Sequence, residues 1–239
     1  GIEAREFDYS KPETLATSLQ GINTLFLISG SEIGQRETQH KNVINAAKEA
    51  GVKRIVYTSL LYATDSEMAL AKEHVATEKL LSESGLSYTI LRNGWYTENY
   101  AGSIAGALQA GAFIGSAQNG KISSATREDF AEAAAVVLTT EGHENKIYEL
   151  AGDDAYTLSD LASEISKQTG KNIPYNDLTE EEYTKVLVSV GLPEGFAQIL
   201  ADSDAKAAKG SLYSEDKTLS KLIGRPTTPL ADVVKDFIG

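Results

Sequence analysis

The sequence predicts an α/β protein with a doubly wound parallel sheet and a small, mostly helical C-terminal lobe. Two observations indicate this class. Short apolar runs typical of strands alternate with stretches of helical periodicity, which is the pattern of βαβ units. The strand predicted to end at Asn93 also leads into a loop of hydrogen-bonding and aromatic side chains, where open α/β sheets bind ligands. The alternative is a loop whose aromatic side chains cover the sheet edge.

The first half of the chain alternates regularly. A strand is predicted over Ile2–Asp8, and Lys11–Leu19 is a helix with a proline early in its first turn. Thr24–Ser29 is a continuous apolar run that suits a strand buried on both faces, and Gly51 ends a helix over Gln39–Ala50. The next strand, helix and strand are predicted over Arg54–Ser59, Ala69–Ser84 and Ser87–Asn93.

After residue 100 the elements become shorter and more helical. Helices are predicted over Gly102–Gly111, Glu128–Thr139, Thr157–Thr169, from the capping box Thr179…Glu182, and near 194–208, 214–223 and 229–238; extended pieces are predicted over Ala112–Gly115, Gly120–Ser123 and Ile173–Tyr175, and a late strand over Lys146–Ala151. We therefore predict a sheet domain over residues 1–156 and a small lobe over 157–239, interleaved with it and covering the site.

Composition excludes several classes of function. The chain has 239 residues, of which 41% are hydrophobic, and no cysteine, so thiolate catalysis and cysteine-ligated metals are excluded. A formal net charge of −12 argues against nucleic-acid binding. No run approaches the ~20 apolar residues of a membrane span, and no signal-peptide pattern begins the chain, so we expect a cytoplasmic protein without membrane insertion. The histidines lack zinc-site spacing, and no G-x-S-x-G elbow supports an esterase.

No G-x-G-x-x-G phosphate-binding turn is present in the sequence. The nearest candidate, Gly30–Gly34, follows a predicted strand but has the wrong spacing and contains Glu32. Motif matches need the right structural context, so this segment is a weak candidate for a phosphate site.

Long ordered strings nevertheless carry a family resemblance. They are residues 7–9 (FDY), 27–32 (LISGSE), 39–47 (QHKNVINAA), 57–61 (YTSLL), 74–79 (HVATEK), 91–100 (LRNGWYTENY), 124–127 (SATR), 148–152 (YELAG) and 217–224 (KTLSKLIG). Over essentially its whole length the chain resembles the NmrA-like atypical short-chain dehydrogenases. Within them it is most similar to the bacterial quinone-reducing branch, which is related to the triphenylmethane reductases.

The resemblance implies a Rossmann-like fold and a function. We expect an NADPH-dependent reductase, with NADH also possible, that passes hydride directly to a quinone or similar flat acceptor without flavin or metal. The expected protein is a monomer or homodimer. The alternative is an NmrA-type redox sensor that binds NADP(H) without turnover. Relative to the family, about 45 residues carrying the first strand, Gly-rich turn, first helix and second strand have no counterpart, so we expect a gap inside the sheet.

The resemblance also assigns cofactor-binding residues. They lie after the predicted strands and comprise Ser29, Gly30, Ser31, Thr58, Ser59, Asn93, Gly94, Trp95, Tyr96, Thr97, Glu98 and Arg127. Trp95 and Tyr96 are expected to offer planar surfaces to a quinone ring. Arg127 is expected to pair with a cofactor phosphate, with a surface ion pair as the alternative.

The catalytic group is not determined by the sequence. Ordinary short-chain dehydrogenases use Tyr-x-x-x-Lys for proton exchange, whereas His74 and Glu78 stand at those positions here, and Lys79 lies on another side of the helix. His74 and Glu78 share a helix face as an acid/base pair or, equally, as a solvated polar pair. The candidates are therefore His74, Asn93 and Tyr96, and the departure favours quinone reduction over alcohol and ketone chemistry.

Overall fold

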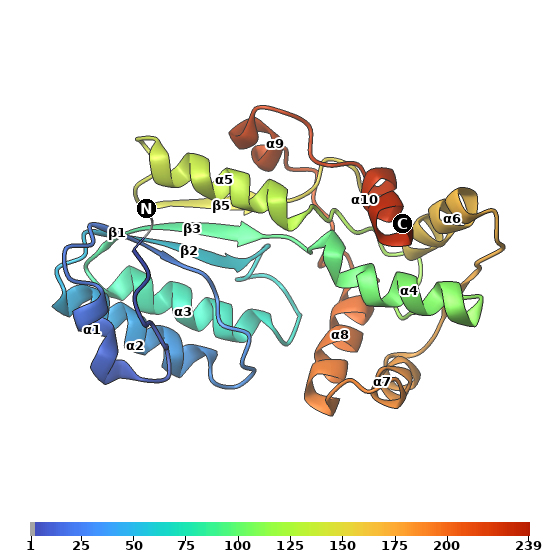
Figure 1. The fold of residues 1–239 in the computed structure, drawn as a ribbon, viewed down its shortest axis with the longest axis horizontal. Helices are drawn as coiled ribbons and strands as arrows, with labels where there is room; N and C mark the ends of the chain where they lie inside the picture. Colours follow the sequence, from blue (N-terminus) through green and yellow to red (C-terminus); the bar gives the residue numbers. More distant parts are fainter. Residues whose placement is uncertain (1–2) are drawn as a thin grey trace.

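A four-stranded parallel sheet forms the centre of the sheet half of the molecule (Figure 1). The computed structural model describes residues 3–239. The strands are β1 (Thr24–Leu27), β2 (Arg54–Leu60), β3 (Ser87–Asn93) and β5 (Lys146–Leu150), in the spatial order β1-β2-β3-β5. One face is covered by α1 (Pro12–Ser18), α2 (Arg36–Glu49) and α3 (Ala71–Glu83), the other by α5 (Arg127–Thr139) and α9 (Thr218–Ile223). The predicted α/β class is confirmed.

Burial explains why the central strands form. All seven residues of β2 are buried, as expected of a parallel strand covered on both faces. On one face Leu27, Ile55 and Ile90 pack with the helices α1, α2 and α3, and on the other Val56 and Leu91 pack with α5. The hydrophobic effect at these two layers holds the sheet between its helices.

The predicted first strand is wrong. Ile2 lies outside the described residues, and residues 3–8 form no strand. Instead, Arg5 donates hydrogen bonds to the carbonyls of Ser18 and Gln20, so this segment lies against the end of α1. The gap was expected on the side of β1 away from β2, and within residues 3–239 β1 pairs with β2 alone, from Thr24 to Leu27, with no strand on its other side.

The prediction that Thr24–Ser29 is buried on both faces needs correction as well. Thr24 is exposed, Leu25 and Phe26 are half-buried, and only Leu27 of β1 is buried. Among residues 3–239, β1 has a single strand neighbour and is therefore an edge of the sheet. An edge strand exposes part of its surface whatever its apolar content.

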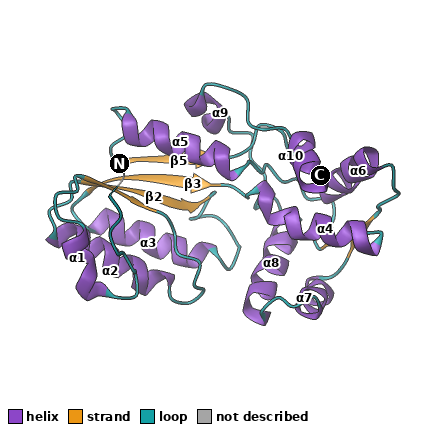
Figure 2. Cartoon of the chain, in the orientation of Figure 1, coloured by secondary structure: helices purple, strands orange, loops and turns teal. Residues whose placement is uncertain are grey.

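The other half of the molecule is mostly helical (Figure 2). It contains the 3₁₀ turn η1 (Thr97–Tyr100), the helices α4 (Ala101–Ala110), α6 (Leu158–Thr169), α7 (Glu180–Ser189), α8 (Glu194–Ala207) and α10 (Leu230–Ile238), and a parallel pair of short strands, β4 (Phe113–Gly115) and β6 (Tyr175–Asp177). The capping boxes predicted at Thr157 and Thr179 are confirmed, and a third begins α5 at Thr126. The division at residue 156 stays a prediction.

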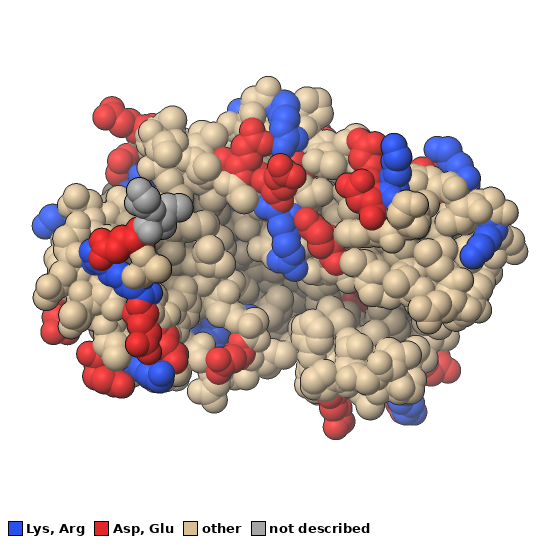
Figure 3. Space-filling view, viewed as in Figure 1, with Lys and Arg blue, Asp and Glu red and all other residues tan. Residues whose placement is uncertain are grey.

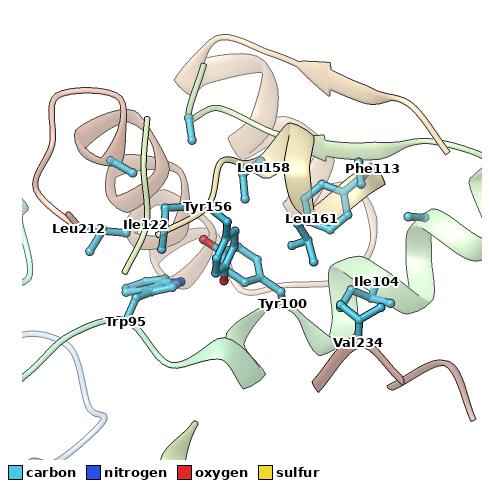
Figure 4. Packing of buried hydrophobic residues seen from close by; sticks show 14 of the residues in the cluster. Trp95, Tyr100, Ile104, Phe113, Ile122, Tyr156, Leu158, Leu161, Leu212 and Val234 are labelled. Carbon is cyan, nitrogen blue, oxygen red and sulfur yellow. The ribbon is translucent and has the colours of Figure 1, made fainter. Parts of the chain in front are cut away.

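The core of this half is built around aromatic side chains (Figure 4). Trp95, Tyr100 and Tyr156 are all buried and pack with Phe113 and Leu158. Because only Gly94 separates Trp95 from the end of β3, this core begins at the carboxyl end of the sheet. The two halves are therefore joined by packing as well as by the chain.

On the face drawn in Figure 3, acidic and basic side chains are interspersed. Within residues 3–239, the longest and most apolar helices still fall short of what crossing a membrane requires.

Candidate functional site

The carboxyl ends of the parallel strands lie together at the end of the sheet that faces the helical half (Figure 1). Below, "sheet edge" means this end of the sheet and not the edge strand β1. Leu60 at the end of β2 is in register with Asn93 at the end of β3, and Asn93 is in register with Leu150 of β5. The segments that follow β2, β3 and β5 therefore start side by side, and β1 ends beside them with Leu27 opposite Tyr57 of β2. This is the edge at which open α/β sheets bind ligands.

The loop after β1 is tied to β2 and α2. The backbone N–H of Ser29 donates to Thr58 Oγ1 at 2.8 Å, and that of Gly30 donates to His40 Nε2 at 2.9 Å. Ser29 and Gly30 are half-buried, while Ser31 is exposed. The structure thus brings together four of the predicted residues, and the Thr58 hydroxyl serves the neighbouring loop.

The strand β3 ends with a polar side chain whose hydrogen-bonding capacity is only partly used. Asn93 is 5% exposed, and its Nδ2 donates to the Tyr96 hydroxyl at 3.3 Å. Its Oδ1 is buried and has no hydrogen-bond partner within residues 3–239. Gly94 follows with its N–H bonded to Leu150 O at 2.7 Å, and an added Cβ would approach that oxygen to 3.0 Å. Gly94 therefore allows the loop to pass close to β5.

Tyr96, Glu98 and Arg127 form a second cluster beside Asn93. The Arg127 guanidinium lies over the Tyr96 ring, 4.2 Å from its centroid, and Phe130 meets the same ring edge-on at 5.3 Å. Glu98 Oε1 accepts the backbone N–H of Arg127 at 2.7 Å, which satisfies one of the free amides in the first turn of α5. Glu98 Oε2 is buried without a partner among the described residues.

Trp95 and Thr97 point away from this cluster. Trp95 is 7% exposed, and its indole nitrogen is turned toward Tyr100 and Tyr156 in the aromatic core (Figure 4). Thr97 Oγ1 is 2.8 Å from Ser124 Oγ, which is 2.7 Å from the Tyr156 hydroxyl. The expectation that Trp95 offers a free planar surface is therefore corrected, because its ring is used in packing.

Ser59, His74 and Glu78 lie on the α3 side of the sheet. Ser59 Oγ donates to Glu78 Oε1 at 2.6 Å, and the Tyr57 hydroxyl is 2.8 Å from His74 Nδ1. Burial, reinforced by the charge of Arg36, lowers the pKa of His74 to about 3. His74 and Glu78 are both buried and bond to different partners. They form neither a solvated pair nor an acid/base pair with each other.

Sequence reasoning missed a buried ion-pair network. Arg92 donates to Glu78 Oε2 at 2.6 Å and to Glu149 Oε1 at 2.8 Å, and Glu149 Oε2 accepts the backbone N–H of Tyr62. These carboxylates raise the pKa of Arg92 further. The available signal was an arginine inside an apolar strand, since a buried charge requires a partner. His40, whose ring holds Gly30, had no comparable signal.

One cavity of the molecule lies away from this edge of the sheet. A cavity of ≈ 440 Å³ lies in the helical half, where Asp177, Thr179, Glu182 and Lys209 are among its lining residues. Acidic side chains there would repel a phosphate-bearing ligand. Within residues 3–239 no cluster of histidine, aspartate and glutamate has the arrangement of a metal site.

The residues at the sheet edge fit a nicotinamide dinucleotide. Asn93 Oδ1 is a buried acceptor without a partner among the described residues, which suits an amide donor. Arg127, exposed at the start of α5, is a cation suited to phosphate. The site thus offers a hydrogen-bond acceptor in Asn93 Oδ1, a cation in Arg127 and backbone loops close to the ends of the strands.

Comparison with known proteins agrees with this geometry. Residues 1–141 match the protein family described as NAD(P)H-binding. The chain is 58% identical over 234 residues to quinone oxidoreductase 2 of Escherichia coli, which covers 98% of this chain and 82% of the relative. The crystal structure of NADPH-dependent quinone oxidoreductase from Escherichia coli, complexed with NADPH, is similar with a TM-score of 0.97 and 56% identity, covering 100% of this chain and 84% of that chain. Triphenylmethane reductase of Citrobacter sp., complexed with NADP(H), has a TM-score of 0.94 and 38% identity, covering 99% and 84%.

Proposed function

The chain belongs to the NAD(P)H-binding, NmrA-like family, and from that premise we propose that it is an NADPH-dependent oxidoreductase that reduces quinones. The observation that carries the proposal is the 58% identity to a quinone oxidoreductase over 98% of the chain. The match extends through the helical half, so it includes the segments that would cover an acceptor as well as the cofactor half. A flat, electron-poor ring is the class of substrate.

The residues at the sheet edge would hold the cofactor. The loops Ser29–Ser31 and Asn93–Glu98 would lie against it, with Asn93 Oδ1 accepting from an amide group and Arg127 neutralising a phosphate. Bound NADPH supplies the hydride. The protein's contribution is to place the acceptor beside the cofactor and to exclude water from the contact.

Proton supply needs no dedicated acid in this proposal. His74 and Glu78 stand where the Tyr-x-x-x-Lys pair is found in ordinary short-chain dehydrogenases, and both are engaged in buried hydrogen bonds. Tyr96, half-buried at the site, offers a hydroxyl, and water offers another donor. Hydride transfer to a quinone leaves a delocalised, weakly basic phenolate that forms without a positioned acid and takes its proton afterwards from either donor, whereas the alkoxide formed from a ketone needs an acid during the transfer.

The test is single-turnover and steady-state kinetics of NADPH oxidation with several quinones and with a triphenylmethane dye. We expect turnover without added flavin or metal, and a primary isotope effect when the transferred hydrogen of NADPH is replaced by deuterium. Tight NADPH binding with no oxidation by any acceptor would contradict the proposal and favour a redox sensor of the NmrA type.

The same proposal includes a cytoplasmic location, where the reductant is an intracellular metabolite, and a monomer or homodimer as the working form. Sedimentation of the protein at several concentrations, with and without NADPH, measures the latter.

A further inference from the structure

A cluster of buried aromatic and titratable side chains lies beneath the loop after β1, and the proposed reaction uses none of its ionisable groups. His40 of α2 is 0% exposed, and its ring centroid is 5.4 Å from that of Tyr57 on β2. Tyr57 in turn bonds His74 of α3. A histidine buried this completely is kept only where both of its ring nitrogens find partners.

The hydrogen bonds of His40 fix which nitrogen carries the proton. The Thr77 hydroxyl donates to the carbonyl of Glu73 at 3.0 Å, so Thr77 Oγ1 accepts from His40 Nδ1–H at 2.9 Å. The unprotonated Nε2 is then free to accept the backbone N–H of Gly30 at 2.9 Å. Only the neutral ring with its proton on Nδ1 satisfies both contacts.

The environment keeps that ring neutral. Burial, with the nearby charge of Arg36 as the second cause, lowers the pKa of His40 to about 4. Protonation would place a second hydrogen on Nε2, facing the Gly30 N–H, and would break the contact. At neutral pH His40 Nε2 therefore stays unprotonated and able to accept the Gly30 N–H.

The Gly30 peptide is held from both sides. Arg36 Nε donates to its carbonyl at 2.8 Å, while His40 accepts from its N–H. Just before it, Thr58 accepts the N–H of Ser29, and the Tyr9 hydroxyl donates to the carbonyl of Ile28. Among these contacts, only the one with His40 holds the backbone N–H of Gly30, which lies in the middle of the loop.

We propose that His40 is a positioning residue for the cofactor: its neutral imidazole sets the orientation of the Gly30 peptide and so preorganises the loop Ser29–Gly30–Ser31 that receives NADPH. The inference rests on the proposed function, because that loop is assigned to the cofactor there. His40 touches no reacting atom. Because His40 orders the loop in the free protein, NADPH binding does not have to supply the free energy of ordering it.

Removal of the acceptor should weaken cofactor binding more than it slows the chemistry. Without Nε2 the N–H of the half-buried Gly30 loses its partner, and the free loop relaxes to let water reach it. Binding must then restore the original orientation, which we expect to raise the Kd and KM for NADPH about tenfold and to leave kcat within about twofold.

Three variants test this. His40→Phe removes the acceptor and keeps a ring, whereas His40→Gln replaces it with an amide oxygen of similar reach. Tyr57→Phe is the matched control, because it removes a buried hydrogen bond in the same cluster that does not touch the loop. Calorimetric titration with NADPH in the absence of a quinone, melting curves and quinone kinetics are measured on each. We expect the tenfold loss in His40→Phe, substantial rescue in His40→Gln, and unchanged affinity in Tyr57→Phe despite a lower melting temperature.

Nitrogen NMR of the unsubstituted protein adds a readout independent of cofactor binding. The His40 ring should show the Nδ1–H tautomer, with a hydrogen-bond coupling between its Nε2 and the Gly30 amide nitrogen. An unchanged Kd in a folded His40→Phe variant, an equal loss in Tyr57→Phe, or the Nε2–H tautomer would each overturn the inference. Absence of NADPH oxidation in the unsubstituted protein would instead contradict the proposed function, and the tautomer would still be measurable.

Discussion

At the scale of single residues, burial separates neighbours that look alike in the sequence. Asn93, Trp95 and Tyr96 belong to one polar and aromatic loop, yet Trp95 packs in the core while Tyr96 stays half-buried under Arg127. Asn93 is buried with an oxygen that no described residue satisfies. A buried polar atom without a partner costs free energy, and a ligand that satisfies it recovers that cost. The two types of residue should respond differently to substitution.

Asn93→Ala should impair function without unfolding the protein. The side chain makes one long hydrogen bond, at 3.3 Å, so its removal should change the free energy of unfolding by less than about 1 kcal/mol. Loss of an acceptor for the cofactor should lower kcat/KM for NADPH about tenfold. Steady-state kinetics with urea unfolding measures both. A normal kcat/KM would remove Asn93 from the site.

Trp95→Ala should have the opposite result. The indole is packed among Tyr100, Ile122 and Tyr156, so truncation leaves a large cavity and should cost about 3–5 kcal/mol of unfolding free energy. Trp95→Phe keeps an aromatic ring and should cost less. Denaturant midpoints and slopes measure the loss. If Trp95→Ala unfolds at the same urea concentration but loses quinone turnover, the indole contacts substrate after all.

At the scale of elements, the Arg92 network joins three parts of the sheet half. Arg92 on β3 bonds Glu78 on α3 and Glu149 on β5, and Glu149 holds the backbone N–H of Tyr62, whose φ is +52°. The left-handed conformation of Tyr62 is uncommon for a residue with a side chain and needs such support. The network therefore fixes the loop after β2 as well as the spacing of α3 from the sheet.

Glu78→Ala should be strongly destabilising for this reason. It leaves Arg92 buried with one carboxylate, and breaking a buried ion pair costs about 3–5 kcal/mol. Arg92→Met should also destabilise, but the double variant should lose much less than the sum, because Glu78 and Arg92 no longer leave each other unpaired, and the loss of the Arg92–Glu149 pair is already included in Arg92→Met. Urea unfolding of the four proteins in this cycle measures the coupling. Additive losses would show that the pair contributes little.

The elements also show what the sequence could predict. The bounds of β3 are as predicted, because Gly85 and the polar loop after Asn93 bracket a short run with the tyrosine, threonine and isoleucine that favour strands. The strand predicted over Ile2–Asp8 was wrong because Phe7 packs against the cluster that contains Leu15 of α1 and Arg5 bonds the end of that helix, tertiary contacts that no local pattern encodes. The edge loops of the site followed from sheet topology, whereas the burial of Trp95 and the contact of His40 with Gly30 depend on distant segments. The expected function came from the family resemblance. Which of the predicted site residues can contact a ligand depends on packing, which the sequence did not reveal.

At the scale of the whole molecule, buried titratable groups in the two halves make the stability depend on pH in opposite directions. In the sheet half His40 and His74 have lowered pKa values, about 4 and about 3, because burial disfavours their charged forms. The unfolded chain binds more protons there, so their contribution to stability is lost as pH falls below about 6.5. In the helical half Asp204 is 4% exposed, and burial raises its pKa to about 7. The folded state binds the extra proton there, so that contribution is lost as pH rises through about 7.

Asp204→Asn isolates the second effect. Asn stays neutral at all pH values and keeps an oxygen able to accept the backbone N–H of Ser116, which Asp204 now binds at 3.1 Å. At low pH, where Asp204 is protonated, variant and unsubstituted protein should be similar in stability; the variant's advantage should grow between about pH 4 and about pH 7 and reach about 2–4 kcal/mol. Because His40 and His74 are common to both proteins, their titration cancels in the difference. Urea unfolding at about pH 5 and about pH 8 measures it, with the exposed Asp236→Asn as control. A stability difference that does not change with pH would show that Asp204 is already ionised in the folded protein at about pH 5, and that the tyrosines around it, Tyr100, Tyr156 and Tyr183, tolerate a buried charge.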